Sequence, residues 1–200
     1  EVPMPMFTAM DEPKHSAQRT TVAPSLGPSP VADMRADAIA RTAEVLDGLP
    51  IGETFDWVDR VSMELTTQML ARLFDFPWDE RRKLAIWSDI LADIESFANE
   101  EARKHRLETA YEMGMAFHAL WESKKGQPRT NDLTSTMLNS ESMSDMSEGE
   151  FIGNLILLIV GGNDTTRHSM SAYAHILGQY PDQRAKLEAD PALAANAVQE

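Results

Sequence analysis

The segment LLIVGGNDTTRHS, residues 157–169, joins an apolar run to two glycines, an acid and two threonines. Ser147, with Glu150 three residues later, forms a capping box at the mouth of this run, and a capping box marks the start of a helix. After it, no breaker stronger than glycine occurs before Pro181. The sequence therefore predicts one long central helix over about residues 149–180, some 30 residues or about 45 Å in length.

The rest of the chain contains apolar residues at helical spacing, bounded by Pro, Gly and Asp, and almost no strand signal. We therefore expect a mainly α fold. The further predicted helices are a short one starting at Pro13, Val31–Leu46, Trp57–Phe74, Asp79 to about Phe97, Glu100 to about Ser123, a brief piece at Leu133–Leu138, and two short ones starting at Pro181 and Pro191.

Three of these helices have a predicted apolar face. In the helix from Asp79 to about Phe97 it is formed by Trp87, Ile90, Leu91 and Ile94. The other two are Trp57–Phe74 and Glu100 to about Ser123. The spacing of three and four residues in the first predicts a stripe that packs into the core, formed by Val58, Val61, Leu65, Met69 and Leu73. In the second, the same argument predicts one face containing Leu107, Tyr111, Met115, His118 and Trp121.

Composition excludes several classes of function. A chain of 200 residues with 42% apolar residues is long enough for one core, and we interpret 1–200 as a single partial domain cut from a longer protein. The absence of cysteine excludes disulfides, thiolate metal sites and cysteine nucleophiles within these residues. A net charge of −14 argues against nucleic-acid binding. The best apolar run is too short to cross a membrane, so we expect a cytoplasmic protein.

The glycines indicate a ligand site on the long helix. Leu158, Gly161, Gly162, Thr165 and Ser169 lie on one helix face, and each glycine costs about 1 kcal/mol relative to alanine there. The Thr165 hydroxyl can bond the Gly161 carbonyl and locally open the helix. The adjacent acid at position 164 needs a partner or water on such an apolar helix. The competing interpretation is that the glycines only permit two helices to cross closely.

The run Gly161–Thr166 resembles the oxygen-activation motif of cytochrome P450 monooxygenases, [Ala or Gly]-Gly-x-[Asp or Glu]-Thr-[Thr or Ser], at every position. Earlier in the chain, MDEPKHSAQR is similar to the family's His-x-x-x-Arg helix, with His15 and Arg19 in the two defined positions and Glu12 replacing a proline. The resemblance covers essentially the whole chain. It implies the helical portion of the cytochrome P450 fold.

The resemblance also implies a cofactor and roles for individual residues. His15 and Arg19 would hold the propionates of haem b, whose iron binds a cysteine that lies outside this chain, so no metal ligand is expected here. Gly161 and Gly162 would leave room for O₂. Thr165 and Asp164 would be the catalytic pair that delivers protons, and the nearby side chains that face the substrate would be Leu157 and Leu158.

Within the family, the stretches MELTTQMLARLFDFPWDERRKLAIWSD (63–89) and LILLIVGGNDTTRHS (155–169) resemble soluble bacterial alkane and fatty-acid terminal hydroxylases. This implies a medium-chain aliphatic substrate, O₂, and electrons from a ferredoxin and a ferredoxin reductase. It also places Glu200 near a Glu-x-x-Arg motif. This fragment alone should be inactive.

Two other hypotheses compete with this one. Asp164 and His168, four residues apart, could bind a metal together with Glu12 and His15, although a di-iron bundle needs a second Glu-x-x-His motif. The second is a non-enzymatic all-helical ligand-binding module, in which the long helix borders an apolar pocket. That module explains the apolar lining but gives no reason for GGNDTT.

Overall fold

A computed structural model of the chain describes residues 4–94 and 99–199, so the predictions for Phe97 and Glu200 lie outside the described residues. Within these ranges the chain is helical and contains no strand. The α-helices are α1 Lys14–Val22, α2 Pro28–Asp47, α3 Glu64–Phe74, α4 Arg82–Ala92, α5 Glu100–Lys124, α6 Leu133–Leu138, α7 Glu148–Gln179, α8 Pro181–Ala189 and α9 Ala194–Ala197. Short 3₁₀ turns (η1 Phe7–Ala9, η2 Ala23–Leu26, η4 Trp78–Glu80, η6 Pro191–Leu193) and the π-helical segment η3 Val58–Met63 join them.

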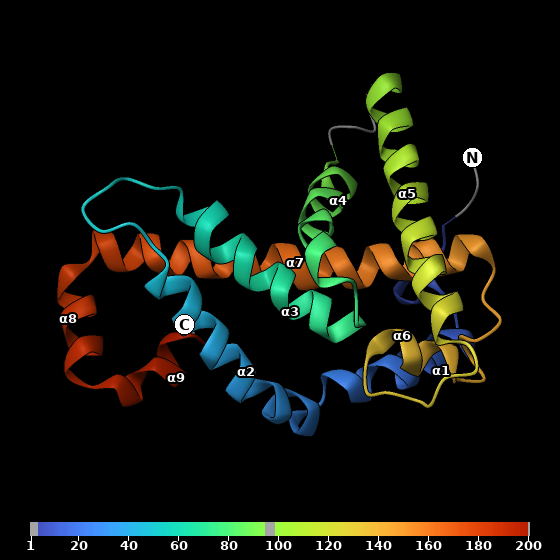
Figure 1. The fold of residues 1–200 in the computed structure, drawn as a ribbon, viewed down its shortest axis with the longest axis horizontal. Helices are drawn as coiled ribbons and strands as arrows, with labels where there is room; N and C mark the ends of the chain where they lie inside the picture. Colours follow the sequence, from blue (N-terminus) through green and yellow to red (C-terminus); the bar gives the residue numbers. More distant parts are fainter. Residues whose placement is uncertain (1–3, 95–98, 200) are drawn as a thin grey trace.

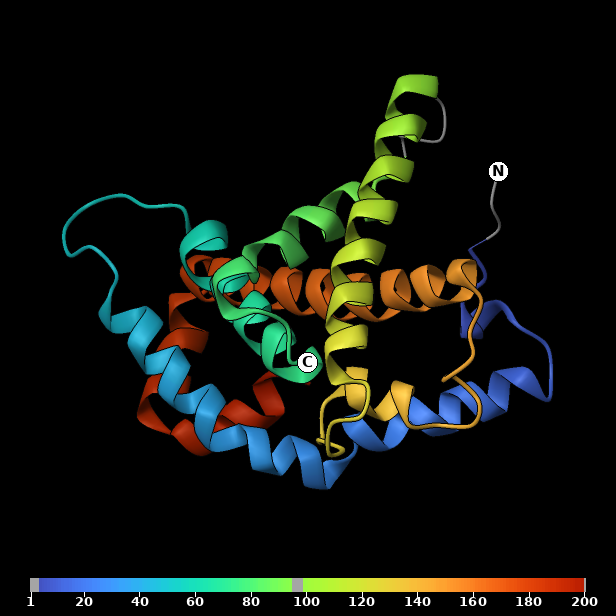
Figure 2. The ribbon, with the colours of Figure 1, turned by 45° about the vertical axis from the view of Figure 1, so that its right-hand side comes forward.

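Helix α7 is the axis of the structure (Figure 1). It begins at the predicted capping box, in which the side chains of Ser147 and Glu150 each bond the other's backbone N–H. Segment η3 and helices α3, α4 and α5 all contact α7, and α5 crosses it steeply (Figure 2). Helices α1 and α6 lie near the N-terminal end of α7, whereas α8 and α9 turn back from its C-terminal end (Figure 1). The prediction of one long central helix is confirmed.

The core lies where α3, α4, α5 and α6 meet the first half of α7. Its centre is aromatic: the rings of Phe74 and Phe117 meet edge to face at 5.2 Å, and Phe76 lies 5.0 Å from Phe117 and 5.8 Å from Trp87. Aromatic pairs at these distances add about 0.5–1.5 kcal/mol beyond the apolar area they bury. This cluster joins α3, α4 and α5 into one layer, which then covers α7 through Leu155 and its neighbours.

Two predicted faces were wrong in part. In residues 57–74 the chain starts as the π-helical η3, and the wider π turn shifts the phase of the following α-helix. Val61 and Leu65 are buried as predicted, but Val58 is exposed, and the side chains at the centre of the core are those of Leu70 and Phe74.

In α5 the buried face is rotated from the predicted one. Met113 and Phe117 are fully buried, whereas Leu107 and Met115 are exposed, and Trp121 is the one predicted residue that is buried. The hydrophobic residues of α5 surround much of the helix, so spacing alone did not show which side meets α7.

Glycines at two positions of α7 lie in close contacts. A Cβ on Gly153 would lie 2.5 Å from the carbonyl oxygen of Pro5 and 2.7 Å from that of Met4, so the N-terminal segment crosses α7 with backbone against backbone. A Cβ on Gly162 would lie 2.9 Å from Leu70 Cδ2 in α3. At Gly162, α3 thus approaches α7 closely, and the place of Gly162 beside a cofactor stays a prediction.

A partly buried cluster of charged side chains holds the start of α4 against α3. Glu64 accepts hydrogen bonds from Arg81 Nη2 at 2.7 Å and from Arg82 Nη1 at 3.1 Å, and Gln68 Nε2 also donates to it at 2.7 Å. Burial raises the pKa of the Glu64 carboxyl, but the hydrogen bonds from Gln68 and Arg81 and the charges of Arg81 and Arg82 outweigh this, so its pKa is lowered.

The replacement Gly153→Ala in the full-length protein should lower the free energy of unfolding by about 1–3 kcal/mol, because backbone atoms of Met4 and Pro5 cannot move aside as a side chain would. Gly178→Ala is the matched control in the same helix: its Cβ meets nothing within 4 Å, so it should stabilise by up to about 1 kcal/mol. Urea unfolding followed by circular dichroism measures both. Equal effects would contradict the backbone contact.

Glu64→Gln should make the free energy of unfolding less dependent on pH in the acid range. Because the pKa of Glu64 is lowered on folding, its stabilisation is present above the unfolded carboxyl pKa of about 4.3 and is lost as pH falls through the folded value. The difference in unfolding free energy between the wild type and Glu64→Gln should therefore shrink between about pH 5 and pH 3. Urea unfolding across this range tests it, and a constant difference would contradict it.

Candidate functional site

The two glycines of the motif face different surroundings. A Cβ on Gly161 would meet no atom within 4 Å, and the residue is exposed, whereas a Cβ on Gly162 would meet Leu70. The structure thus separates a pair that the sequence placed on one face. Gly161 leaves an open surface on α7, and Gly162 lets α3 approach the other side.

Thr165 lies on the same open surface as Gly161. Its side chain is exposed, and its Oγ1 donates a hydrogen bond of 2.7 Å to the Gly161 carbonyl oxygen, as the spacing predicted. The expected opening does not interrupt the helix, since α7 is α-helical from Glu148 to Gln179. A hydroxyl has one proton and two acceptor lone pairs, so Thr165 keeps its acceptor capacity toward a ligand above Gly161.

Asp164 is anchored on the α4 side of α7. Its Oδ1 accepts from Ser88 Oγ at 3.1 Å and from Arg167 Nη2 at 3.1 Å. The same Arg167 nitrogen lies 2.5 Å from Asp89 Oδ1 in α4. The hydrogen bond to Asp89 raises the pKa of the largely buried Arg167 guanidinium against the effect of desolvation, and the charges of Asp89 and Asp164 add to this. Arg167 thus bonds two carboxylates and holds the Asp164 side chain against α4. Asp164 directly precedes Thr165 in the sequence.

Sequence reasoning missed most of this network. It identified the need of Asp164 for a partner but not Arg167, which sits three residues later in the same helix and could have been found by that spacing. Ser88 and Asp89 are more than 70 positions away along the chain and gave no such signal. Asn163 was also missed: it is fully buried, and its Oδ1 accepts from Thr66 Oγ1 of α3 at 2.9 Å.

Helix α1 presents His15 and Arg19 on its outer side. Phe7 O accepts a 2.7 Å hydrogen bond from His15 Nδ1; since a carbonyl only accepts, Nδ1 carries the proton and Nε2 is left to meet a ligand. Arg19 is exposed and pairs with no carboxylate among residues 4–94 and 99–199. Gln18, which directly precedes Arg19, is fully buried and hydrogen-bonded to Asn154 of α7 at 2.9 Å.

The structure brings some predicted residues together and leaves others apart. Gly161 and Thr165 share one exposed surface, and Leu157 and Leu158 lie half-buried one turn before them, with part of each side chain against the core. Asp164 points to α4 instead of this surface. Helix α1 docks near Asn154, seven residues before Gly161 on α7, which is about 10 Å along the helix axis.

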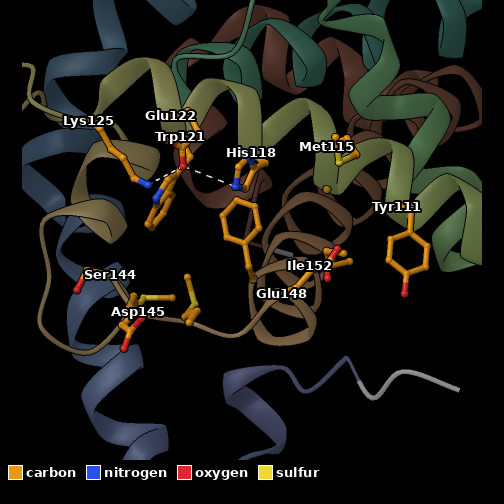
Figure 3. A pocket seen from close by; sticks show the side chains of 14 residues that line it. Tyr111, Met115, His118, Trp121, Glu122, Lys125, Ser144, Asp145, Glu148 and Ile152 are labelled. Carbon is orange, nitrogen blue, oxygen red and sulfur yellow. Dashed lines mark hydrogen bonds and ion pairs between the residues drawn. The ribbon is translucent and has the colours of Figure 1, made fainter.

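A hollow of about 470 Å³ lies elsewhere, between the second half of α5 and the start of α7 (Figure 3). Met115, Trp121 and Phe151 supply apolar walls, and Glu122 at its edge bonds Lys125 at 2.6 Å and lies 3.6 Å from His118. None of the predicted site residues lines this hollow. It is separate from the surface at Gly161.

Comparison with known proteins identifies the chain. No protein-family model matches it. It is 31% identical over 198 residues to linalool 8-monooxygenase from Pseudomonas putida, covering 97% of this chain and 48% of that protein. A cytochrome P450-153 structure from Novosphingobium aromaticivorans matches with a TM-score of 0.89 and 50% identity, over 98% of this chain and 47% of that one. The chain is part of a cytochrome P450.

A second P450 structure, CYP153D17 from Sphingomonas sp. PAMC 26605, matches with a TM-score of 0.91 and 60% identity, over 100% of this chain and 50% of that one. The chain thus spans about half the length of the P450 proteins it matches. The predicted family and fold class are confirmed. That 1–200 form a single partial domain stays a prediction. No described helix has the length and apolarity needed to cross a membrane.

The P450 family implies haem, and the described residues fit it. A haem carries two carboxylates and a flat face, and the chain provides an unpaired guanidinium on Arg19, a free Nε2 on His15 and a helix surface without a side chain at Gly161. The sequence contains no cysteine, so the iron ligand is not among these 200 residues.

The metal-site alternative does not fit the geometry. The Asp164 carboxylate is engaged with Arg167 and Ser88, while His168 Nδ1 bonds the Asp164 carbonyl oxygen at 2.7 Å and not its carboxylate. Glu12 accepts from Ser16 Oγ at 2.6 Å. Among the residues that the structure describes, no group of three or more His, Cys, Asp and Glu side chains could hold a metal ion.

Replacing Arg167 by Met should destabilise the full-length P450 by about 2 kcal/mol, because Asp164 then remains partly buried without its counter-charge. Asp89→Asn is the control: the Asp89 side chain is 46% exposed, so this change should cost less than about 1 kcal/mol. Urea unfolding measures both losses. Equal losses would show that Arg167 serves the surface pair and not Asp164.

Proposed function

We propose that the whole protein is a haem-thiolate monooxygenase that hydroxylates medium-chain alkanes or fatty acids at the terminal position. Oxygen comes from O₂ and electrons come from a ferredoxin and a ferredoxin reductase. The observation that carries the proposal is the open helix surface at Gly161 with the Thr165 hydroxyl on it. In the described part of the chain, His15 and Arg19 also have no carboxylate partner. A cytoplasmic location stays a prediction.

Haem, when bound, supplies the activation of O₂ and the oxidation of the substrate C–H bond. With a proton on both ring nitrogens, His15 donates from Nε2 to one of the haem carboxylates, and the Arg19 guanidinium donates as well. Such charge-assisted hydrogen bonds are about twice as strong as neutral ones. Gly161 keeps a side chain out of the space over α7, so that haem and a small molecule fit between the helix and the rest of the protein.

Thr165 supplies the hydrogen bond nearest to this space. Its proton points to the Gly161 carbonyl at 2.7 Å, so the side chain accepts from a water or ligand in this rotamer and donates to it after a rotation about χ1. A hydroxyl that switches between the two is suited to passing on a proton that arrives from elsewhere.

Asp164 supplies that proton. Its carboxylate is held by Ser88 and Arg167 on the α4 side, so delivery to Thr165 requires it to leave these partners or to act through water. The ion pair with Arg167 holds the carboxylate beside α4 until it moves.

Leu157 and Leu158 form the apolar wall next to Gly161 that meets the substrate. An aliphatic chain offers no hydrogen bond, so a wall of leucines binds it by burial alone, at about 25 cal/mol per Å² of apolar surface. The relative named linalool 8-monooxygenase supports a monooxygenase that acts on a small organic molecule. No observation favours the non-enzymatic binding module.

The test uses the complete protein expressed with haem. The reduced carbon monoxide difference spectrum should show the thiolate-bound form, and incubation with octane, ferredoxin, reductase and NADH should give 1-octanol. A missing thiolate-type spectrum would contradict the proposed class. Hydroxylation only within the chain would contradict the terminal position.

Thr165→Ala should retain haem and substrate binding but release hydrogen peroxide, with product per NADH reduced about tenfold or more, the range expected for loss of a proton-transfer group. Thr166→Ala is the matched control, since it removes the same hydroxyl about 100° around the helix. Product, peroxide and NADH are measured together. Unchanged coupling in Thr165→Ala would contradict the role given to Thr165.

A further inference from the structure

Asn154 is a fully buried carboxamide on the core side of α7. Its Oδ1 accepts a 2.8 Å hydrogen bond from the backbone N–H of Phe7, and its Nδ2 donates to Gln18 Oε1 at 2.9 Å and lies 3.2 Å from Met146 Sδ. Burying an amide is costly unless its polar atoms are bonded. Leucine has a similar volume and would avoid that cost, so the two hydrogen bonds are the reason for asparagine here.

The two partners of Asn154 each lead to one of the residues proposed to hold haem. Phe7 donates its N–H to Asn154 and, through its carbonyl oxygen, accepts the 2.7 Å hydrogen bond from His15 Nδ1. The Phe7 and His15 rings also lie 6.4 Å apart. Gln18 immediately precedes Arg19 in α1. One carboxamide therefore fixes the supports of both side chains.

The neighbouring residue on α7 completes the contact. Because Gly153 lacks a side chain, the Met4 and Pro5 carbonyls lie directly on the helix, within 2.7 Å of where its Cβ would be. The backbone of the segment that leads to Phe7 thus packs on Gly153, and the Phe7 N–H donates to Asn154. Gly153 and Asn154 together form the site on α7 where the N-terminal segment and α1 dock.

The other polar links of α1 to the start of α7 and to the segment before it are more exposed. Lys14 pairs with Glu150, but the Lys14 side chain is 54% exposed, and Thr21 bonds Ser142 Oγ at 2.8 Å at the edge of the core. Exposed ion pairs contribute little, about 0–1 kcal/mol. The buried Asn154 contacts are therefore the ones that set the orientation of α1 on α7.

We propose that Asn154 is a positioning residue that sets where His15 and Arg19 meet the haem carboxylates, acting through Phe7 and Gln18. This rests on the proposed function, because it takes His15 and Arg19 to hold haem. Asn154 does not contact haem itself. Without it, the Phe7 carbonyl no longer holds His15 Nδ1 in place, and α1 is free to rotate or shift on α7.

The test compares Asn154→Leu and Gln18→Met with Ile152→Val in the full-length holoprotein. Gln18→Met removes the hydrogen bond between Gln18 and Asn154, keeps that between Phe7 and Asn154, and keeps the shape of the side chain. It also removes the buried Gln18 Nε2, which has no partner in the described structure. Ile152 is buried on the same part of α7 but packs toward Gly114 of α5, so Ile152→Val is the control for a loss of core packing alone.

The measurements are the rate of haem transfer to excess apomyoglobin, the reduction potential, and the urea midpoint. Asn154→Leu should release haem about tenfold faster than the wild type and shift the potential, Gln18→Met should do so to a smaller extent, and Ile152→Val should do neither. Asn154→Leu values equal to those of Ile152→Val would overturn the proposal.

If Asn154→Leu yields no holoprotein, Gln18→Met decides: wild-type haem release and potential in that variant would overturn the proposal. The proposed function and the positioning role of Asn154 can be contradicted separately. A wild type without a thiolate-type carbon monoxide spectrum contradicts the proposed function. A normal wild type with unaffected variants contradicts only the positioning role of Asn154.

Discussion

The structure depends on the burial of one face of α7 along most of its length. Leu155, Ile159, Asn163 and Arg167 follow each other at four-residue spacing, and all four are buried. The first two are apolar and pack into the aromatic core, whereas the last two are polar and bond Thr66 and Asp89 on α3 and α4. The helix is thereby held over its whole middle section while its opposite face, with Gly161 and Thr165, stays open.

This division of α7 explains how an acid and an alcohol can be neighbours in sequence and have different surroundings. Residues 164 and 165 are about 100° apart around the helix, so one side chain meets α4 and the other meets the open surface. Arg167 and Ser88 hold the Asp164 side chain in place, whereas the Thr165 hydroxyl bonds the Gly161 carbonyl oxygen within its own helix.

The N-terminal part of α7 has a different role. Around Gly153 and Asn154 the helix receives the N-terminal segment and α1 through close backbone contact and a buried carboxamide. Both parts of α7 therefore use polar groups inside a mostly apolar interface, and the Asn154 hydrogen bonds to Phe7 and Gln18 join segments distant in sequence. Such contacts cost desolvation but specify a single orientation, which apolar packing alone does less well.

The sequence by itself determined the helical class, the extent of α7 and the GGNDTT surface motif, because these follow from local signals: the capping box at Ser147, proline at 181, and the i, i+4 bond from Thr165 to Gly161. It also placed α6 and α8 within a residue or so, since caps and prolines act on their own neighbourhood.

Only the tertiary structure decided the rest. It turned Gly162 toward Leu70, supplied Asp164 with Ser88, and joined Asn154 to Phe7 and Gln18. The π turn before α3 and the apolar residues around α5 made their buried faces unreadable from spacing. These outcomes depend on side chains dozens of residues away, whose proximity no local pattern encodes, because packing among whole helices selects them.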